Sequence, residues 1–364
     1  MRKMTSVSGR GHRNDRLSGQ YAIPLLLSIL GHFFLSAAPV SADALEQISF
    51  RDRIFDLTVR NKELFVVGFP GIMLHSADQG ETFSAIDVGM DDALFDIDIA
   101  PDGIGAVVGR AGLLMTTTDG GKTWKKQTTG AKEHLFSVSV ISGGKIWAAG
   151  HFGTIIHSSD GGKTWTPQEY DATLPEAPEG DVKAESKRYE ITAEDENEGA
   201  VEEARLNSVA FADAQNGWIT GEFGLVLHTE DGGETWKRQR SNVSLLMFTI
   251  RAITKDKLVA VGSEGTYIET EDGGNHWNEI ETGVTENLYS VSLLGNKCIV
   301  AGQWGLVLVR DDAKGSFTRV PTGLYSWLGS TAMIDSRVGF VAGGRGYLLK
   351  TSDGGMTWEK LSGR

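Results

Sequence analysis

The chain has 364 residues, of which 40% are hydrophobic, 46 are glycine and one is cysteine, and its formal net charge is −13. This length allows one large domain or two ordinary ones, and the glycine content without collagen periodicity predicts many tight turns. The acidic balance argues against a nucleic-acid surface and against docking on anionic lipid. The lone Cys298 excludes an internal disulfide, so the core must hold the fold together.

The first 42 residues are typical of an export signal. Five basic residues precede a 20-residue apolar run, and small residues permit cleavage after Ala42 or two residues later. The run is long enough for an uncleaved membrane anchor, which is the alternative, but Pro24 and His32 within it favour cleavage. We therefore predict an exported protein of charge −17, with no membrane span after cleavage. It would be periplasmic, or lumenal in thylakoids if the organism is photosynthetic.

One sequence unit then recurs seven times. A glycine that closes a "VG" or "AG" pair marks each unit, and the spacings are 41, 41, 71, 41, 40 and 41 residues. These marker glycines are Gly68, Gly109, Gly150, Gly221, Gly262, Gly302 and Gly343. An Asp follows each marker by ten residues and an aromatic residue by fifteen, which excludes a chance similarity. Such a period indicates a repeat architecture.

Each unit predicts four short strands. In the fourth unit these are "LNSVAFAD", "NGWITG", "GLVLHTE" and "TWKRQR", separated by Gly- and Asp-containing turns. Because a four-stranded unit of about 40 residues has the size of a propeller blade, residues 43–364 are predicted to form one all-β, seven-bladed β-propeller with antiparallel strands. The first strand of a unit is the most apolar, as expected if it lines the central channel. Residues 45–50 are expected to add a strand beside the last unit and close the ring.

The turn between the third and fourth strands carries the motif S/T-x-D-G-G-x-T-W, which resembles the Asp-box, or BNR repeat. Its carboxylate can accept backbone N–H groups within the turn, its glycines adopt angles closed to other residues, and its Trp buries an apolar ring. A catalytic group is needed once rather than seven times, so we interpret the motif as structural. The structural residues are Asp78, Asp119, Asp160, Asp231, Asp272, Asp312, Asp353, Trp124, Trp165, Trp236, Trp277 and Trp358.

The same reasoning excludes His75, His157 and His228 as catalytic or metal-binding residues. They share one strand position, which other units fill with unrelated residue types. No cluster in the sequence has the ligand spacing of a zinc or calcium site, and no phosphate loop or dinucleotide fingerprint is found. We therefore expect neither a metal nor a cofactor.

The loops between the second and third strands differ from unit to unit. Each has two residues between paired glycines, and in an antiparallel blade these loops lie on the face opposite the D-G-G turns. Variable positions on a repeated frame are where binding specificity usually lies, although some of the rings could simply pack on neighbouring blades. The predicted binding residues are Arg110, His151, Phe152, Glu222, Phe223, Glu264, Gln303, Trp304 and Arg345.

An acidic insertion at about 169–203 separates the third and fourth units and carries a net charge of −10. Its composition predicts a solvated segment that joins the face of the variable loops. It could dock a basic partner, gate the channel mouth, or be a tolerated surface insertion.

The recurrent pattern "LFSVSVISGGKIWAAGHFGTIIHSSDGGKTW", over about residues 45–361, resembles the photosystem II stability/assembly factor family. The resemblance implies an exported, non-enzymatic propeller that helps assemble a membrane protein complex. Photosynthetic members use an Arg-rich surface to bind a reaction-centre subunit, whereas Arg110, Arg345 and Arg251 are scattered here. We therefore expect a relative from non-photosynthetic bacteria: a monomeric accessory of a membrane complex, such as a transporter.

The alternative is a glycosidase, because Asp-boxes also occur in sialidases and xyloglucanases. The early R-I-P motif of a sialidase is absent, and a xyloglucanase would require two propellers. The best pair of opposed carboxylates on the variable face is Glu222 and Glu264. With no serine-nucleophile signature in the sequence, we expect no enzymatic activity.

Overall fold

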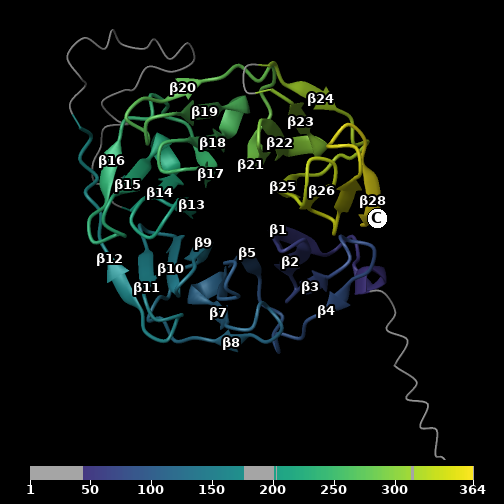
Figure 1. Cartoon of the computed structure of the whole chain (residues 1–364), viewed down its shortest axis with the longest axis horizontal. Coiled ribbons are helices and arrows are strands. Elements are labelled where there is room, and N and C mark those ends of the chain that lie inside the picture. The colour runs from purple at the N-terminus through teal and green to yellow at the C-terminus, as the bar shows by residue number, and fades with distance from the viewer. Residues whose placement is uncertain (1–43, 176–200, 202, 313–314, 364) are drawn as a thin grey trace, which may run out of the picture. The chain divides into compact units, whose positions relative to one another are not determined.

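Seven four-stranded antiparallel sheets are arranged as a ring (Figure 1), and each contains the four strands of one sequence unit in chain order. The computed structural model describes residues 44–175, 201, 203–312 and 315–363. The predicted signal peptide (1–42) and the middle of the predicted acidic insertion lie outside these residues. The prediction of a seven-bladed β-propeller is confirmed. We call each sheet a blade and number the blades in chain order.

The strand bounds are as follows. Blade 1 contains β1 Arg53–Arg60, β2 Glu63–Phe69, β3 Met73–Ser76 and β4 Ser84–Ala85; blade 2 contains β5 Leu94–Ile99, β6 Gly105–Gly109, β7 Leu114–Thr117 and β8 Lys125–Lys126. Blade 3 contains β9 Leu135–Ile141, β10 Lys145–Gly150, β11 Ile155–Ser158 and β12 Thr166–Gln168; blade 4 contains β13 Leu206–Phe211, β14 Gly217–Gly221, β15 Val226–Thr229 and β16 Lys237–Gln239. Blade 5 contains β17 Met247–Ala252, β18 Leu258–Gly262, β19 Tyr267–Thr270 and β20 Asn278–Glu279. Blade 6 contains β21 Leu288–Leu294, β22 Lys297–Gly302, β23 Val307–Arg310 and β24 Thr318–Val320; blade 7 contains β25 Leu328–Met333, β26 Gly339–Gly343, β27 Leu348–Thr351 and β28 Glu359–Ser362.

Five short 3-10 helices complete the secondary structure of the described residues. They are η1 Ala44–Gln47, η2 Arg110–Gly112, η3 Glu222–Gly224, η4 Ser263–Gly265 and η5 Gln303–Gly305. The last four form the turns between second and third strands. No helix among the described residues is long and apolar enough to cross a membrane.

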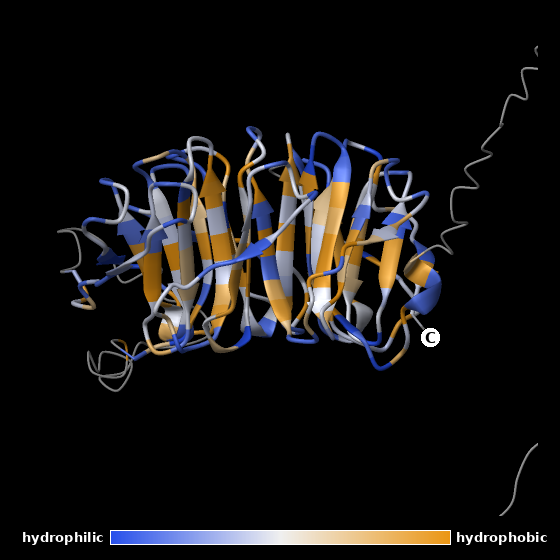
Figure 2. Cartoon of the chain, turned by 90° about the horizontal axis from the view of Figure 1, so that it is seen from below, coloured by the Kyte–Doolittle hydropathy of each residue, from blue (hydrophilic) through white to orange (hydrophobic). Residues whose placement is uncertain are grey.

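Burial increases from the first strand to the second strand of a blade. Every residue of β6, β14, β18 and β26 is buried, whereas β5 alternates between buried and half-buried positions. The first strands are the innermost, as Figure 1 shows. They line the channel, as predicted, and they are less buried than the second strands because one side of each faces the channel while second strands pack on both faces. Figure 2 shows hydrophobic residues along the strands and hydrophilic residues in the loops at both ends.

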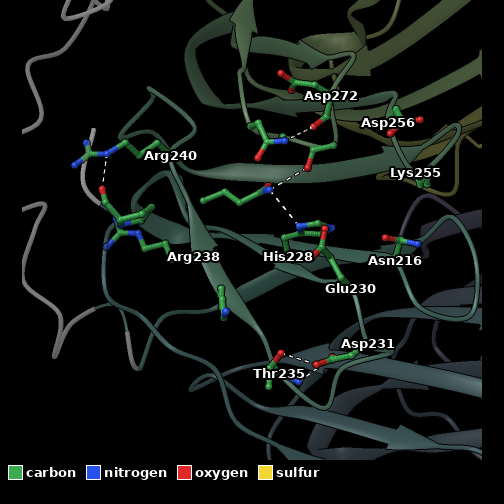
Figure 3. A pocket seen from close by; sticks show the side chains of 16 residues that line it. Asn216, His228, Glu230, Asp231, Thr235, Arg238, Arg240, Lys255, Asp256 and Asp272 are labelled. Atoms are coloured by element: carbon green, nitrogen blue, oxygen red, sulfur yellow. Dashed lines mark hydrogen bonds between the residues drawn. The ribbon is translucent and has the colours of Figure 1, made fainter. Parts of the chain in front are cut away.

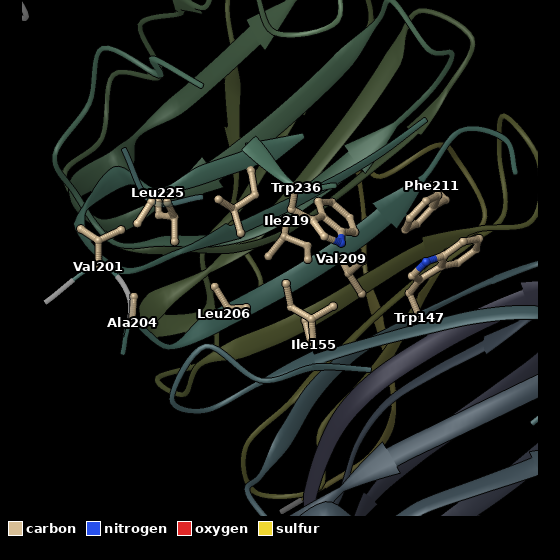
Figure 4. Close-up of a cluster of buried hydrophobic side chains, with 13 residues drawn as sticks. Trp147, Ile155, Val201, Ala204, Leu206, Val209, Phe211, Ile219, Leu225 and Trp236 are labelled. Atoms are coloured by element: carbon tan, nitrogen blue, oxygen red, sulfur yellow. The ribbon is translucent and has the colours of Figure 1, made fainter. Parts of the chain in front are cut away.

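The core consists of seven hydrophobic clusters, one between each pair of neighbouring blades. Between blades 3 and 4 (Figure 4), the ring of Trp147 stacks on Phe211 with centroids 3.6 Å apart. The Trp147 indole also donates to the carbonyl of Gly232 in the next blade's turn at 3.0 Å. Burying a large aromatic side chain stabilises a fold by about 1.5–3 kcal/mol, so these interfaces supply the cohesion that disulfides would otherwise provide.

Ring closure between blades 7 and 1 involves no exchanged strand. The predicted strand at 45–50 is wrong, because these residues include most of η1 and a following turn, and both end blades already have four strands of their own. Instead, an apolar cluster joins the two blades. The Ser330 hydroxyl in β25 also accepts the Leu57 N–H at 3.1 Å and donates to Asp56 at 2.7 Å.

The turn between third and fourth strands uses nearly every polar group of its motif. In blade 2, Asp119 Oδ1 accepts the N–H groups of Lys122 and Thr123 at 3.0 Å, and its Oδ2 accepts the Thr123 hydroxyl at 2.6 Å. The Thr117 hydroxyl donates to the same carboxylate at 2.8 Å and accepts the Gly121 N–H at 3.0 Å. Equivalent bonds surround Asp78, Asp160, Asp231, Asp272 and Asp353. These carboxylates are therefore occupied by their own turns.

The three repeated histidines serve packing. His157 and His228 stack on Trp147 and Trp218 with centroids 4.6 Å apart, and His75 stacks on Phe65 at the same distance. Burial lowers the pKa of His157 and His228, which keeps these rings neutral at physiological pH.

Candidate functional site: the channel mouth

A β-bulge interrupts the first strand of every blade one residue after its start, or two residues after it in blade 1. In blade 2, Leu94 pairs with the marker glycine Gly109, but the next pair is Asp96 with Val108, which leaves Phe95 as the extra residue. Bulges re-aim side chains and occur beside functional sites. The seven bulge residues are Phe55, Phe95, Phe136, Asn207, Phe248, Tyr289 and Gly329.

The marker glycines are required by this bulge. A Cβ on Gly109 would overlap the carbonyl oxygen of Ala93, and the marker glycines of the other blades meet the corresponding carbonyl in the same way. The marker glycine is therefore repeated because only a residue without a Cβ lets the second strand approach the first this closely at the start of the bulge.

The bulge residues meet at the channel mouth, on the face that carries the second–third loops. They line a cavity of about 490 Å³ together with Trp327. Ring centroids are 5.3 Å apart for Phe55 and Phe95, and 5.7 Å apart for Phe95 and Phe136. Aromatic pairs at such spacings attract each other by about 0.5–1.5 kcal/mol beyond their burial. We call Phe55, Phe95, Phe136, Phe248, Tyr289 and Trp327 the aromatic collar; all six are half-buried.

Blade 7 supplies its collar ring from another position. A Cβ on Gly329 would come within 2.7 Å of the Trp327 ring, so glycine at the bulge leaves room for that indole. Trp327 in turn stacks on Phe55 of blade 1, with centroids 5.9 Å apart and planes 13° from parallel.

The residue after each bulge connects one blade to the next. Its side chain accepts a backbone N–H from the neighbouring first strand, as Ser137 does from Val209 at 3.1 Å and Ser208 from Ile250 at 3.2 Å. We call this bond the stitch. Ser290 and Ser330 form the same bond, and Thr249 instead donates to the Tyr289 carbonyl.

Blades 1 and 2 carry an aspartate at the stitch position instead of serine. Asp96 accepts the Val138 N–H at 2.8 Å, and Asp56 lies within 3.3 Å of the Ile97 N–H. Two residues further along β5, Asp98 accepts the Val140 N–H at 2.7 Å, where Ser139 in the next blade makes the equivalent bond to Phe211. A serine hydroxyl is thus sufficient for the bond, and the carboxylates add charge that the frame does not require.

These three carboxylates line the channel below the collar. They border a cavity of about 460 Å³, and Arg251 of β17 is the one cation among its lining residues. Burial raises the pKa of Asp98 to about 6, against the opposing effect of its bond from Val140. Burial, followed by repulsion from Asp96, also raises the pKa of Asp56 well above its usual range. Three carboxyl groups thus share this cavity with one cation, and burial disfavours their charged forms.

The nine predicted binding residues lie around the collar rather than in it. None of them lines the mouth cavity. Phe152, Phe223 and Trp304 are 56%, 39% and 59% exposed, so they do not simply pack on neighbouring blades. Arg110, Glu264 and Arg345 are also exposed, while His151, Glu222 and Gln303 are half-buried.

Two of these loops contact the collar. His151 lies with its ring centroid 6.0 Å from Phe136 and 4.1 Å from Phe152, so rings run continuously from blade 7 to the exposed loop of blade 3. In blade 4, Glu222 forms a 3.8 Å ion pair with Arg205, whose guanidinium lies 5.9 Å from the centre of the Phe136 ring.

The carboxylates proposed for glycoside hydrolysis are not brought to a common cavity among the described residues. Glu222 is engaged by Arg205, whose backbone N–H it also accepts at 2.9 Å. Glu264 lies on the next blade's loop, where its N–H donates to Asn287. Neither residue lines the channel mouth or the channel.

A second large cavity, of about 690 Å³, lies between the outer strand of blade 4 and the D-G-G turn of blade 5 (Figure 3). Its lining mixes acidic and basic side chains, and it includes Asp231 and Asp272, which are held by their own turns. His228 there contacts Gln239 at 3.3 Å and stacks on Trp218, which are packing roles. None of the predicted binding residues lines this cavity, whereas the loops that carry His151 and Glu222 contact the aromatic collar, so we favour the channel mouth. No cluster of three or more potential metal-ligating residues occurs in the described part of the chain.

The bulge residues carry a sequence signal that the loop-based prediction missed. An aliphatic residue precedes each of them, which gives the pairs "IF", "LF", "LF", "LN", "MF", "LY" and "LG" at 13 or 14 residues before each marker glycine. Five of the seven bulge residues are aromatic. Without the bulge, the regular alternation of the first strand would point this side chain towards a neighbouring blade rather than towards the channel mouth.

Comparison with known proteins agrees with the fold. The family model described as "Photosynthesis system II assembly factor YCF48" matches residues 82–204, 187–246 and 240–325. The structure of YCF48 bound to D1 peptide has a TM-score of 0.61 and 16% identity, and the match covers 83% of this chain and 93% of that one. YCF48 from Cyanidioschyzon merolae gives 0.63 and 17%, with 83% and 95% covered.

The GH74 xyloglucanase from Xanthomonas campestris gives a TM-score of 0.66 at 9% identity, covering 85% of this chain but 53% of that one. No curated protein sequence matched. The fold and the site together define a seven-bladed propeller with an aromatic-lined channel mouth. Because the family model spans more than half of the sequence, the chain belongs to the YCF48 family of photosystem II assembly factors.

Proposed function

We propose that this chain is an exported, non-catalytic binding propeller that assists the assembly or stability of a membrane protein complex. The aromatic collar carries the proposal, because a cavity with half-buried rings on a rigid frame is suited to a protruding segment of a partner. Family membership supports an assembly role, and one relative of the same fold has been solved with a bound peptide. The partner complex is proposed to be a membrane assembly such as a transporter, with the propeller acting as a monomer in the periplasm.

Collar substitutions test this function. Asn207 already occupies the bulge in blade 4, so Phe95→Asn and Phe136→Asn are compatible with the local backbone. We expect the full chain to co-purify a defined set of membrane proteins from detergent extracts of its own organism. The double variant should lose that set while remaining folded, with an unfolding midpoint lowered only by the lost ring contacts. Retention of the same proteins by the folded double variant would contradict the role of the collar.

The glycosidase alternative is tested separately. Hydrolysis of a glycoside panel that disappears in Glu222→Gln would establish an enzyme. We expect no turnover, because Glu222 is paired with Arg205 and lies outside the mouth cavity.

A further inference from the structure

We propose that the channel mouth recognises a basic side chain, a lysine or arginine that protrudes from a segment of the partner protein and enters through the aromatic collar towards the carboxylates of blades 1 and 2. The inference rests on the proposed binding function and specifies the chemistry of the partner.

The first argument is charge. Asp56, Asp96 and Asp98 all line the channel cavity, and Arg251 is the cation among the residues that face them there. At the mouth, the other cation is Arg205, which is paired with Glu222. A cation that arrives from a partner would therefore favour the charged forms of carboxyl groups that, among the described lining residues, outnumber the cations. The acidic balance of the whole chain, −13, favours the approach of such a partner over longer distances.

The second argument is the position of these acids. Serine makes the stitch in four blades, so the fold does not need aspartate at Asp56 and Asp96. Asp56 is buried and Asp96 and Asp98 are half-buried, and carboxylates held near one another in such surroundings are unfavourable unless something compensates them. The raised pKa of Asp98 and Asp56 reflects this. All three acids come from two adjacent blades, which gives the site one acidic side.

The third argument is the collar itself. A cation is attracted to the faces of aromatic rings, and more strongly as water is excluded. Arg205 shows that a guanidinium fits against this collar, because it lies 5.9 Å from the centre of the Phe136 ring. Rings around the entrance and carboxylates below them match the two parts of lysine and arginine, an apolar stem and a charged end.

The probe is a display library of random dodecapeptides, selected on the full chain. We expect the retained peptides to be enriched in lysine or arginine and to be lost on the Phe95→Asn/Phe136→Asn variant. A selected peptide in which norleucine replaces its key lysine should bind at least about tenfold more weakly, and the affinity of the parent peptide should fall as salt is raised.

The matched variant is Asp56→Ser/Asp96→Ser/Asp98→Ser, which copies the residues that other blades use for the same backbone bonds. We expect it to stay folded and to lose the preference for basic peptides. Peptides that require the collar but show no basic enrichment, or bind the triple variant equally well, would overturn the inference and leave the proposed function standing. If no selected peptide requires the collar, the proposed function itself fails.

Discussion

At the scale of single residues, the second–third loops hold side chains where the backbone favours glycine. Phe152, Phe223, Glu264, Trp304 and Arg345 all have φ between 51° and 61°, in the left-handed region. A non-glycine residue there costs about 1 kcal/mol or more. Glycine or asparagine would suit these turns better. The loops therefore keep large and charged side chains against their own conformational preference, which agrees with a role for those side chains in contacts outside the blade.

Replacing one of these side chains by glycine should separate binding from stability. We expect Trp304→Gly to change the free energy of unfolding by less than about 1 kcal/mol, because relief of the left-handed backbone offsets the lost contacts. Binding of a partner that covers this loop should weaken. Ala111→Gly is the control, since it relieves the same conformation and removes only a methyl group. Chemical denaturation provides the measurement, and a loss of several kcal/mol for Trp304→Gly would show that the indole is structural.

For the aspartates of the turns between third and fourth strands, we expect substitution to lower stability. Asp119→Ala should destabilise the fold by about 1–2 kcal/mol, because the N–H groups of Lys122 and Thr123 lose their acceptor. Asp119→Asn should lose less, since its amide oxygen still accepts them. Bonds from Thr123 lower the pKa of Asp119 to about 2, so its contribution is present above the ordinary carboxyl pKa and disappears as the pH falls towards 2. Equal midpoints for wild type and Asp119→Ala would contradict this account.

At the scale of the element, the sequence predicted the four strands of each blade, whereas the aromatic residues of the mouth were missed although five of them recur at 13 or 14 residues before a marker glycine. Repeat spacing, the D-G-G turns and the alternation of apolar residues determine four strands per unit, and "LNSVAFAD" and its three partners are strands as predicted. The bulge escaped prediction because Phe95 belongs to a run, "LFDIDI", that reads as an ordinary strand. Its side chain reaches the channel only because one extra residue shifts the register, and this shift depends on pairing with the next strand.

The stitch gives a prediction at this scale. Ser137→Ala leaves the buried Val209 N–H without its acceptor and should destabilise the protein by about 1–3 kcal/mol. Ser137→Asp should retain the bond while adding a fourth carboxylate near the channel. Amide hydrogen exchange at Val209 would report the loss directly. Unchanged protection in Ser137→Ala would show that the bond does not hold blades 3 and 4 together.

Titration of the Asp98 carboxyl in the channel should appear in the pH dependence of the free energy of unfolding. Asp98 has a folded-state pKa of about 6, raised by burial and by Asp96 and opposed by Val140 and Arg251. A raised pKa contributes stability below the unfolded value that is lost as the pH rises through 6. Asp98→Asn should therefore increase the free energy of unfolding by about 2 kcal/mol at pH 8 and leave it nearly unchanged at about pH 4. An equal effect at both values would point to packing rather than to charge.

At the scale of the whole molecule, the ring has one joint between blades that are not neighbours in the sequence. The contacts between blades 7 and 1 include an apolar cluster, the bonds of Ser330, a bridge between Arg53 and Gly344, an ion pair between Lys350 and Glu81, and the stacked rings of Trp327 and Phe55. The prediction of a closing strand failed because such a strand is not needed when the terminal blades are each complete. The number of blades follows from the repeat, whereas the means of closure depends on side chains that do not repeat.

The Trp327–Phe55 stack places part of this joint inside the proposed binding site. A ligand that contacts both Trp327 and Phe55 would hold blades 7 and 1 together, because the two blades could not separate until the ligand dissociates. A bound ligand would then slow the separation of blades 7 and 1, under force or on heating, more than the affinity of the ligand for either blade alone suggests. Such a propeller would resist unfolding least without its ligand and most with the ligand bound.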